Sequence, residues 1–113
     1  MSRRHTLLRG WATLALCVPA LPGAQAEDPR FAIGKRLFSG EAAPACAVCH
    51  TLKDAGSEGA VGPELDELKP DAQRVVQAVR SGLGVMPAYA DKLTDAQIDA
   101  LAYYVSRASG GAR

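Results

Sequence analysis

The stretch "ACAVCHTLKD", residues 45–54, places two cysteines three positions apart and a histidine directly after the second cysteine. Cys46, Cys49 and His50 therefore put three reactive side chains into five consecutive positions. The chain has 113 residues with 3 cysteines and 2 histidines in all, and the other two of these, Cys17 and His5, lie near the amino terminus. The reactive thiol and imidazole groups of the rest of the chain are thus gathered in this one stretch.

Residues 1–26 have the pattern of a secretory signal peptide. An arginine-rich head without acidic residues precedes an apolar run, "WATLALCVPAL" at 11–21, and small residues follow at 24–26. This order of basic, apolar and small residues is typical of a signal that is removed after export. We predict cleavage after residue 26, which leaves one domain at 27–113 in the periplasm.

A membrane anchor is the alternative reading of the same segment. The apolar run is about half as long as the ~20 residues that a spanning helix needs, and Pro19 and Pro22 interrupt it. Cys17 raises a lipoprotein signal as another possibility, but Leu16 before it is bulky where such signals have a small residue. We expect no stable membrane insertion once the signal has been removed.

The composition favours a small domain that needs help to fold. The formal net charge is +1, and lysine and arginine are scattered along the chain, which does not indicate a nucleic-acid partner. A domain of this length buries only roughly 60–65% of the surface that its unfolded chain exposes, a smaller share than larger domains bury, so its core is marginal. A disulfide, a metal, a cofactor or a partner is expected to supplement it.

Three helices are predicted. The first covers 29–39, where Asp28-Pro29 gives a cap and a helix start; the second includes Pro70 at an early position and ends before Gly82. The third covers 94–109, with Thr94 and Gln97 in capping-box register.

The segments between the helices carry little periodicity. Residues 51–65 contain three glycines and a proline and are expected to be mostly loop; residues 83–93 are expected to be irregular. Since no stretch reads as a strand, the predicted fold class is all-α, with three main helices. Loops this long in so small a domain indicate that they wrap around something.

The C-x-x-C-H pattern of Cys46, Cys49 and His50 is the attachment signature of a c-type haem. Two thiols add across the two vinyl groups of haem to form thioether bonds, and the adjacent histidine becomes an iron ligand. We therefore predict one covalently attached haem c.

Three other uses of these residues fit less well. A zinc site lacks a fourth Cys or His ligand after signal removal, and a thioredoxin-like dithiol lacks its βαβ setting. A disulfide across a two-residue loop stabilises little, because the stabilisation grows with loop length.

Met86 is the candidate for the opposite face of the iron. An electron-transfer haem usually carries Met or a second His as sixth ligand, and no second His remains after residue 26. Met86 stands in "GLGVMPAY", a glycine-rich loop before Pro87. The alternative is a methionine that fills a gap in the core. The predicted iron ligands are therefore His50 and Met86.

From residue 28 to 109 the chain resembles the class I monohaem cytochromes c. The resemblance is carried by "GKRLF", "CAVCH", "GPEL", "GVMPAY" and "LTDAQIDALAYYV". It implies that the first and last helices cross, with Gly34 and Phe38 against Tyr103 or Tyr104. It also implies that the carbonyl of Pro63 accepts a hydrogen bond from the proximal histidine, which adds Pro63 to the cofactor-binding residues Cys46, Cys49, His50 and Met86.

A narrower resemblance concerns the amino-acid sequence of the loops. "GAVGPELDELKPDAQRVVQAVRSGLGVMPAYADKLT" is similar to the small cytochrome subunit of bacterial sulfite dehydrogenases, whose partner subunit holds a molybdenum cofactor. One feature departs from many class I cytochromes: the one tryptophan, Trp11, lies in the signal. A contact to a haem propionate is then left to Arg74, Arg80, Tyr89 or Lys92, among which the sequence does not choose.

The expected function is single-electron transfer by a periplasmic carrier, with no catalytic residue of its own. Six-coordinate iron leaves no open position for a substrate, so the chain by itself is not expected to be an enzyme. Its expected partners are redox proteins: a dehydrogenase, a terminal oxidase or another cytochrome. The alternatives are a fixed electron-relay subunit of a dehydrogenase complex, such as sulfite dehydrogenase, and a gas-binding or sensing haem domain.

Overall fold

The structure is a computed structural model that describes residues 10–23 and 26–112. The predicted signal peptide lies partly outside the described residues, which leave out 1–9 and 24–25, and nothing in the structure tests the predicted cleavage after residue 26. Residues 10–23 contain no helix or strand, and their large apolar side chains are exposed. Within the described ranges, no helix combines the length and the apolar character needed to cross a membrane.

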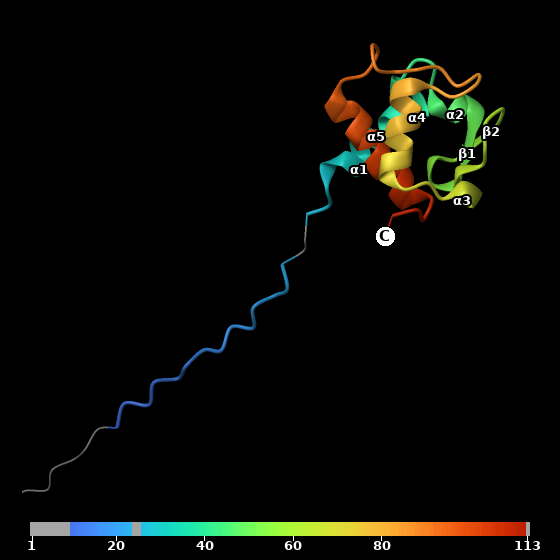
Figure 1. Ribbon diagram of the computed structural model, residues 1–113. Helices are drawn as coiled ribbons and strands as arrows, with labels where there is room; N and C mark the ends of the chain where they lie inside the picture. The colour runs from blue at the N-terminus through green and yellow to red at the C-terminus, as the bar shows by residue number, and fades with distance from the viewer. Residues whose placement is uncertain (1–9, 24–25, 113) are drawn as a thin grey trace, which may run out of the picture.

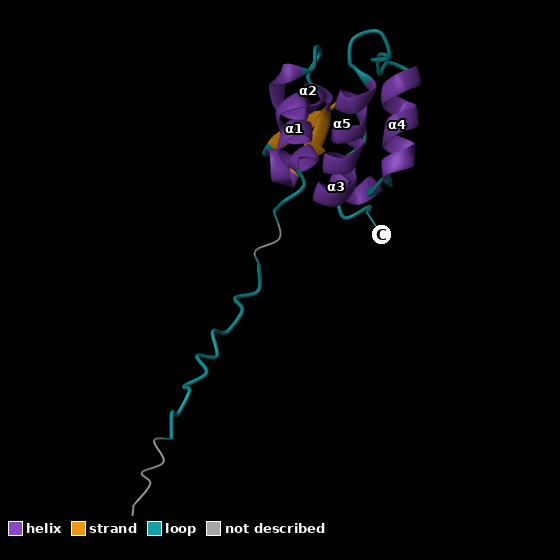
Figure 2. Ribbon diagram, turned by 90° about the vertical axis from the view of Figure 1, so that its left-hand side faces the viewer, coloured by secondary structure: helices purple, strands orange, loops and turns teal. Residues whose placement is uncertain are grey.

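Residues 26–112 fold into a helical domain with a small antiparallel sheet on one side (Figure 1). Seen from the side, α5 stands between α1 and α4 (Figure 2). The elements in chain order are α1 (Pro29–Arg36), a π-helical segment (Leu37–Glu41), α2 (Cys46–Cys49), β1 (His50–Leu52), a 3-10 turn (Lys53–Ala55), β2 (Ser57–Ala60), α3 (Leu65–Leu68), α4 (Ala72–Ser81) and α5 (Asp95–Ala108).

The helices begin where the sequence places their caps. The Asp28 carboxylate accepts a hydrogen bond from the Arg30 amide at the start of α1, and Asp71 does the same for Arg74 at the start of α4. Pro70 thus precedes α4 and does not lie within it. The capping box predicted for α5 is present, with Thr94 and Gln97 each bonded to the backbone of the other. Helices α1, α4 and α5 lie where the three helices were predicted, with shifted ends, and the short helices α2 and α3 were not predicted.

Helices α1 and α5 cross at Gly34. A Cβ atom at Gly34 would overlap the Ala100 carbonyl and lie 2.5 Å from the Cβ of Tyr104, so only glycine allows this approach. The Tyr104 ring packs edge-on against Phe31 and Phe38, with centroid distances of 5.0 and 5.9 Å. Of the two tyrosines that the resemblance left open, it is therefore Tyr104 that meets Gly34 and Phe38.

Tyr103 faces the other way. The guanidinium groups of Arg30 and Arg107 lie over its ring, 4.2 and 3.7 Å from the ring centroid. Arg30 also pairs with Asp28 at 2.8 Å and with Asp99 at 3.0 Å. This cluster joins the start of α1 to α5 at the surface, where cation–π contacts contribute about 0.5–1 kcal/mol each.

The expectation of an all-α chain without strands was wrong at residues 50–60. Strands β1 and β2 pair antiparallel, with His50 opposite Ala60 and Leu52 opposite Ser57. The Ser57 hydroxyl donates to the His50 carbonyl at 2.8 Å and accepts from the Leu52 amide at 3.0 Å. Side-chain bonds thus hold the short hairpin together, and no alternation of apolar residues marks it in the sequence.

Candidate haem site

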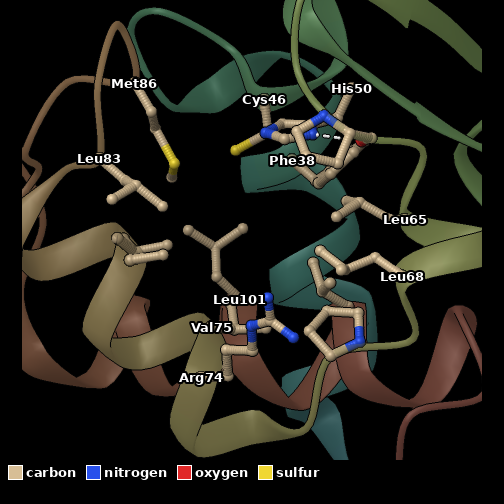
Figure 3. Close-up of a pocket in the computed structure, with 15 residues that line it drawn as sticks. Phe38, Cys46, His50, Leu65, Leu68, Arg74, Val75, Leu83, Met86 and Leu101 are labelled. Atoms are coloured by element: carbon tan, nitrogen blue, oxygen red, sulfur yellow. Dashed lines mark hydrogen bonds between the residues drawn. The ribbon is translucent and has the colours of Figure 1, made fainter.

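Two adjoining hollows, with volumes of about 170 and 270 Å³, open beside α4 and α2. The two hollows share five of their lining residues and therefore form one crevice. The shared residues are Cys46, His50, Pro63, Leu83 and Met86. Figure 3 shows Met86 and His50 on opposite sides of this crevice, with the sulfur atoms of Met86 and Cys46 directed into it. Cys49 lines the larger hollow only. The structure thus brings all five predicted site residues to one place.

Helix α2 is a single turn that presents the two cysteines. It begins after Ala45, which is in an extended conformation, and ends at Cys49, and the next residue, His50, opens β1. Gly59 of β2 packs against this turn: a Cβ there would lie 2.5 Å from the Cys49 carbonyl carbon and 2.6 Å from the His50 nitrogen. The hairpin of β1 and β2, which the sequence did not reveal, therefore packs against the segment that carries Cys49 and His50. Cys46 and Cys49 are free thiols, not a disulfide.

The imidazole of His50 is oriented by a backbone carbonyl. Its Nδ1 lies 2.8 Å from the Pro63 oxygen, the contact that the family resemblance implied. A carbonyl oxygen accepts hydrogen bonds and cannot donate them, so the proton must be on Nδ1. The lone pair of Nε2 is then free for a metal, and the bond fixes the orientation of the ring. That this nitrogen binds iron stays a prediction.

Met86 sits at the end of a tight turn after α4. Leu83 and Met86 exchange two backbone hydrogen bonds, of 3.1 and 3.0 Å, and close the turn over Gly84, whose φ is +59°. Gly82 comes before the turn with φ +70°, and a Cβ there would lie 2.6 Å from the Met86 oxygen. Both glycines are needed because L side chains rarely adopt positive φ. The turn presents Met86 as a fixed point on the crevice wall.

The smaller hollow is lined by apolar side chains except for Cys46, His50 and Arg74. Burial in this wall raises the pKa of the Cys46 thiol to about 11, so the thiol is uncharged at neutral pH. The side chains that form the wall come from four segments of the chain: Phe38, Leu65, Leu68, Pro70, Val75, Ala78, Val79, Leu83, Leu101 and Val105.

Arg74 is the one residue with a permanent charge among those that line the two hollows. It lies at the end of the pocket away from Cys46 (Figure 3). The other three candidates for a propionate contact are engaged elsewhere: Arg80 pairs with Asp95 at 2.9 Å, Tyr89 donates to the Pro44 carbonyl, and Lys92 lies over the Tyr89 ring. The structure therefore favours Arg74.

Sequence reasoning missed Gly62 as a site residue. A Cβ at this position would lie 2.5, 2.8 and 2.9 Å from the Cε1, Nδ1 and Nε2 atoms of His50. The Gly62 amide also donates to the Cys49 carbonyl at 2.7 Å. The glycine before Pro63 is part of the "GPEL" stretch that carries the family resemblance, but the sequence does not show that it lies against the His50 ring.

The donor set of the crevice fits a covalently attached haem. Two thiols, an imidazole with a free Nε2 and a thioether face a cleft whose remaining walls are apolar. An apolar cleft with a few converging polar groups is the usual form of a cofactor site. Arg74, at the end of the pocket away from Cys46, adds a positive charge that would suit the propionate groups of a haem.

Comparison with known proteins agrees with this geometry. A family model described as "Cytochrome C oxidase, cbb3-type, subunit III" matches residues 29–105. Cytochrome c6 of Thermosynechococcus vestitus is 34% identical over 110 residues, which cover 87% of this chain and 87% of that protein. The crystal structure of the c-type cytochrome SorU from Sinorhizobium meliloti is similar with a TM-score of 0.70 and 52% identity, covering 75% of this chain and 97% of that one.

Other relatives are longer than this chain. The match to the chloroplastic cytochrome c6 of Chlamydomonas reinhardtii, 33% identical, covers 73% of this chain and 57% of that protein. The cbb3-type cytochrome c oxidase subunit CcoP of Azospirillum sp. is 35% identical over 83% of this chain, but the match covers 34% of its own length.

Proposed function

Because the chain belongs to the class I monohaem cytochrome c family, we propose that it carries single electrons in the periplasm through one haem c. In this proposal Cys46 and Cys49 would attach the haem, and His50 and Met86 would supply the two protein ligands of its iron. The observation that carries it is the placement of His50 and Met86 on opposite walls of one crevice whose rim holds both thiols. When bound, the haem supplies a one-electron ferric–ferrous couple.

The residues of the chain would tune and protect this couple. The Pro63 carbonyl holds the proton on Nδ1 of His50 and keeps Nε2 available as a ligand. The thioether of Met86 favours the ferrous state and so raises the reduction potential. The apolar wall formed by Val75, Val79 and its neighbours excludes water and disfavours the extra positive charge of the ferric state.

Electrons are expected to leave at the cysteine edge of the crevice. Three apolar side chains surround the larger hollow there and are exposed: Val61 at 68%, Leu83 at 77% and Val85 at 87%. An exposed apolar rim beside the cysteines suits brief contact with a redox protein. Docking of this kind buries little area and dissociates quickly.

A redox titration combined with carbon monoxide binding tests the proposal. The full-length chain, matured in a host that attaches haem, is expected to show one optical transition with a one-electron Nernst slope. Ligation by both His50 and Met86 predicts that the ferrous protein does not bind carbon monoxide rapidly. Rapid binding would contradict six-coordination and favour the gas-binding alternative. Cys46→Ser is expected to leave one thioether bond and to yield less mature protein.

A fixed relay inside a dehydrogenase is the second candidate. It is favoured by the loop resemblance to the cytochrome subunit of sulfite dehydrogenases and by the oxidase subunit among the relatives. Affinity purification of the tagged protein from its native host separates the two. A larger redox partner that stays bound at moderate salt would support the relay, whereas a monomer would support the diffusing carrier.

A further inference from the structure

Tyr89 joins the two halves of the crevice. Its hydroxyl donates to the carbonyl of Pro44 at 2.6 Å, across 45 positions of sequence. Pro44 lies two residues before Cys46, and Tyr89 lies three residues after Met86. Among the described residues, no other hydrogen bond connects the segment 82–93, which carries Met86, to the segment 42–63, which carries the cysteines and His50.

The rest of Tyr89 is held equally firmly. The residue is 4% exposed, and its ring lines the larger hollow. Its amide donates to the Val79 carbonyl at 2.8 Å, and its own carbonyl accepts from Lys92 and Leu93, both at 2.9 Å. Burial raises the pKa of the Tyr89 hydroxyl, so the hydroxyl keeps its proton at neutral pH and can donate. Tyr89 is therefore tied to α4, to the following turn and to the segment before α2.

We propose that Tyr89 is a positioning residue, whose bond to Pro44 holds the Met86 turn against the haem-attachment segment and so controls how easily Met86 leaves the iron. This inference rests on the proposed ligation by Met86. Two backbone hydrogen bonds close the turn at 83–86, and the amides of Gly82 and Tyr89, on either side of it, donate to carbonyls of α4. In this proposal the turn would move away from Cys46 when Met86 leaves the metal, and the Tyr89–Pro44 bond would break. The bond thus opposes displacement of Met86 by an external ligand.

Tyr89→Phe tests this role in the ferric holoprotein. The substitution removes the hydroxyl and keeps the ring that fills the crevice wall. The measurement is an imidazole titration, followed through loss of the far-red sulfur-to-iron absorption band. Because a hydrogen bond of this kind is worth a factor of a few in an equilibrium constant, the variant is expected to bind imidazole about three- to tenfold more tightly than the wild type.

Tyr104→Phe is the matched control. It also removes a tyrosine hydroxyl from a long-range hydrogen bond, here to Asp54 at 2.7 Å, but Tyr104 does not line the crevice. Denaturant unfolding of both variants measures the loss of stability. We expect Tyr104→Phe to be destabilised while its imidazole affinity stays that of the wild type.

The outcomes separate the inference from its premise. Wild-type imidazole affinity in Tyr89→Phe would overturn the positioning role. An equal rise in Tyr104→Phe and Tyr89→Phe would also overturn it, because displacement would then follow global stability alone. A wild-type holoprotein without the sulfur-to-iron band would instead overturn ligation by Met86, and with it the proposed function.

Discussion

The α-carbon of Gly62 lies directly against the imidazole of His50, so closely that a Cβ would stand 2.5 Å from the ring Cε1. The ring is thereby held between this glycine and the Pro63 carbonyl that its Nδ1 contacts. Gly62 has no side chain and so leaves room for the ring, and Pro63 provides the carbonyl that accepts the hydrogen bond. The orientation of the proposed iron ligand depends on both.

Gly62→Ala is expected to displace the His50 ring, because three ring atoms would lie within 3 Å of the new methyl group. We expect a loss of about 1–3 kcal/mol in unfolding free energy, typical of overpacking, and a lower yield of holoprotein. Denaturant unfolding measures the unfolding free energy, and the haem content of the purified protein measures the yield of holoprotein. Gly40→Ala is the control, since nothing lies within 4 Å of a Cβ at that position. Equal behaviour of the two variants would show that the contact does not constrain His50.

Met86→Ala is expected to lower the reduction potential and to abolish the far-red band of the ferric protein. Loss of the thioether removes a ligand that favours ferrous iron, and the change should be on the order of 100 mV, within the roughly 0.8 V over which axial ligands set haem potentials. Spectroelectrochemistry records both quantities. A variant that keeps the band would exclude Met86 as the sixth ligand.

Arg74→Gln is expected to lower the reduction potential by tens of millivolts. A positive charge at the crevice disfavours the ferric state, and its removal therefore stabilises that state. Arg80→Gln removes the same charge from the same helix, but Arg80 pairs with Asp95 and does not line the crevice. Shifts of equal size in the two variants would argue against a specific contact of Arg74 with the cofactor.

Gly34→Ala is expected to weaken the crossing of α1 and α5. The added methyl group would overlap the Ala100 carbonyl and the Tyr104 side chain, which overpacks the core at a cost of about 1–3 kcal/mol. Thermal or denaturant unfolding of the holoprotein measures the loss. An unfolding free energy within about 0.5 kcal/mol of the wild type would mean that the two helices separate easily.

Tyr104→Phe is expected to destabilise the protein more at neutral than at acid pH. The Tyr104 hydroxyl holds the pKa of Asp54 below its ordinary value of 3.8, with Lys35 as a smaller contribution. A depressed pKa stabilises the fold above the ordinary value, and this stabilisation is lost as pH falls through the lowered one. The variant should lose about 1–2 kcal/mol at pH 7 and less at pH 3. Denaturant unfolding at several pH values tests this; a difference independent of pH would contradict it.

The candidate residues of the site could be predicted from the sequence because each reactive residue type is scarce. After the amino-terminal region, His50 and Met86 are the single residues of their kind, which makes them the candidates for the two iron ligands. The contact from His50 to Pro63 came from the family resemblance. Gly34 against Tyr104 needed the structure to choose between two adjacent tyrosines.

The hairpin at 50–60 and the hydrogen-bond partner of Tyr89 could not be predicted from the sequence. Both depend on contacts that produce no periodic pattern of apolar residues. The hairpin at 50–60 is held by the Ser57 hydroxyl and by the close approach of Gly59, not by alternating apolar side chains. The partner of Tyr89 is a backbone carbonyl far away in the sequence, and a carbonyl is present at every position. The fold alone shows which one is used.

The alkaline pyridine spectrum of the full-length protein, purified from a host that matures c-type cytochromes, tests the central claim most directly. Attachment through both Cys46 and Cys49 predicts the spectrum of a haem with two saturated vinyl groups, in a one-to-one ratio to protein, and haem that stays with the protein in acidified acetone. Colourless protein, or haem that the acidified solvent extracts while both thiols remain free to react with alkylating agents, would contradict the account.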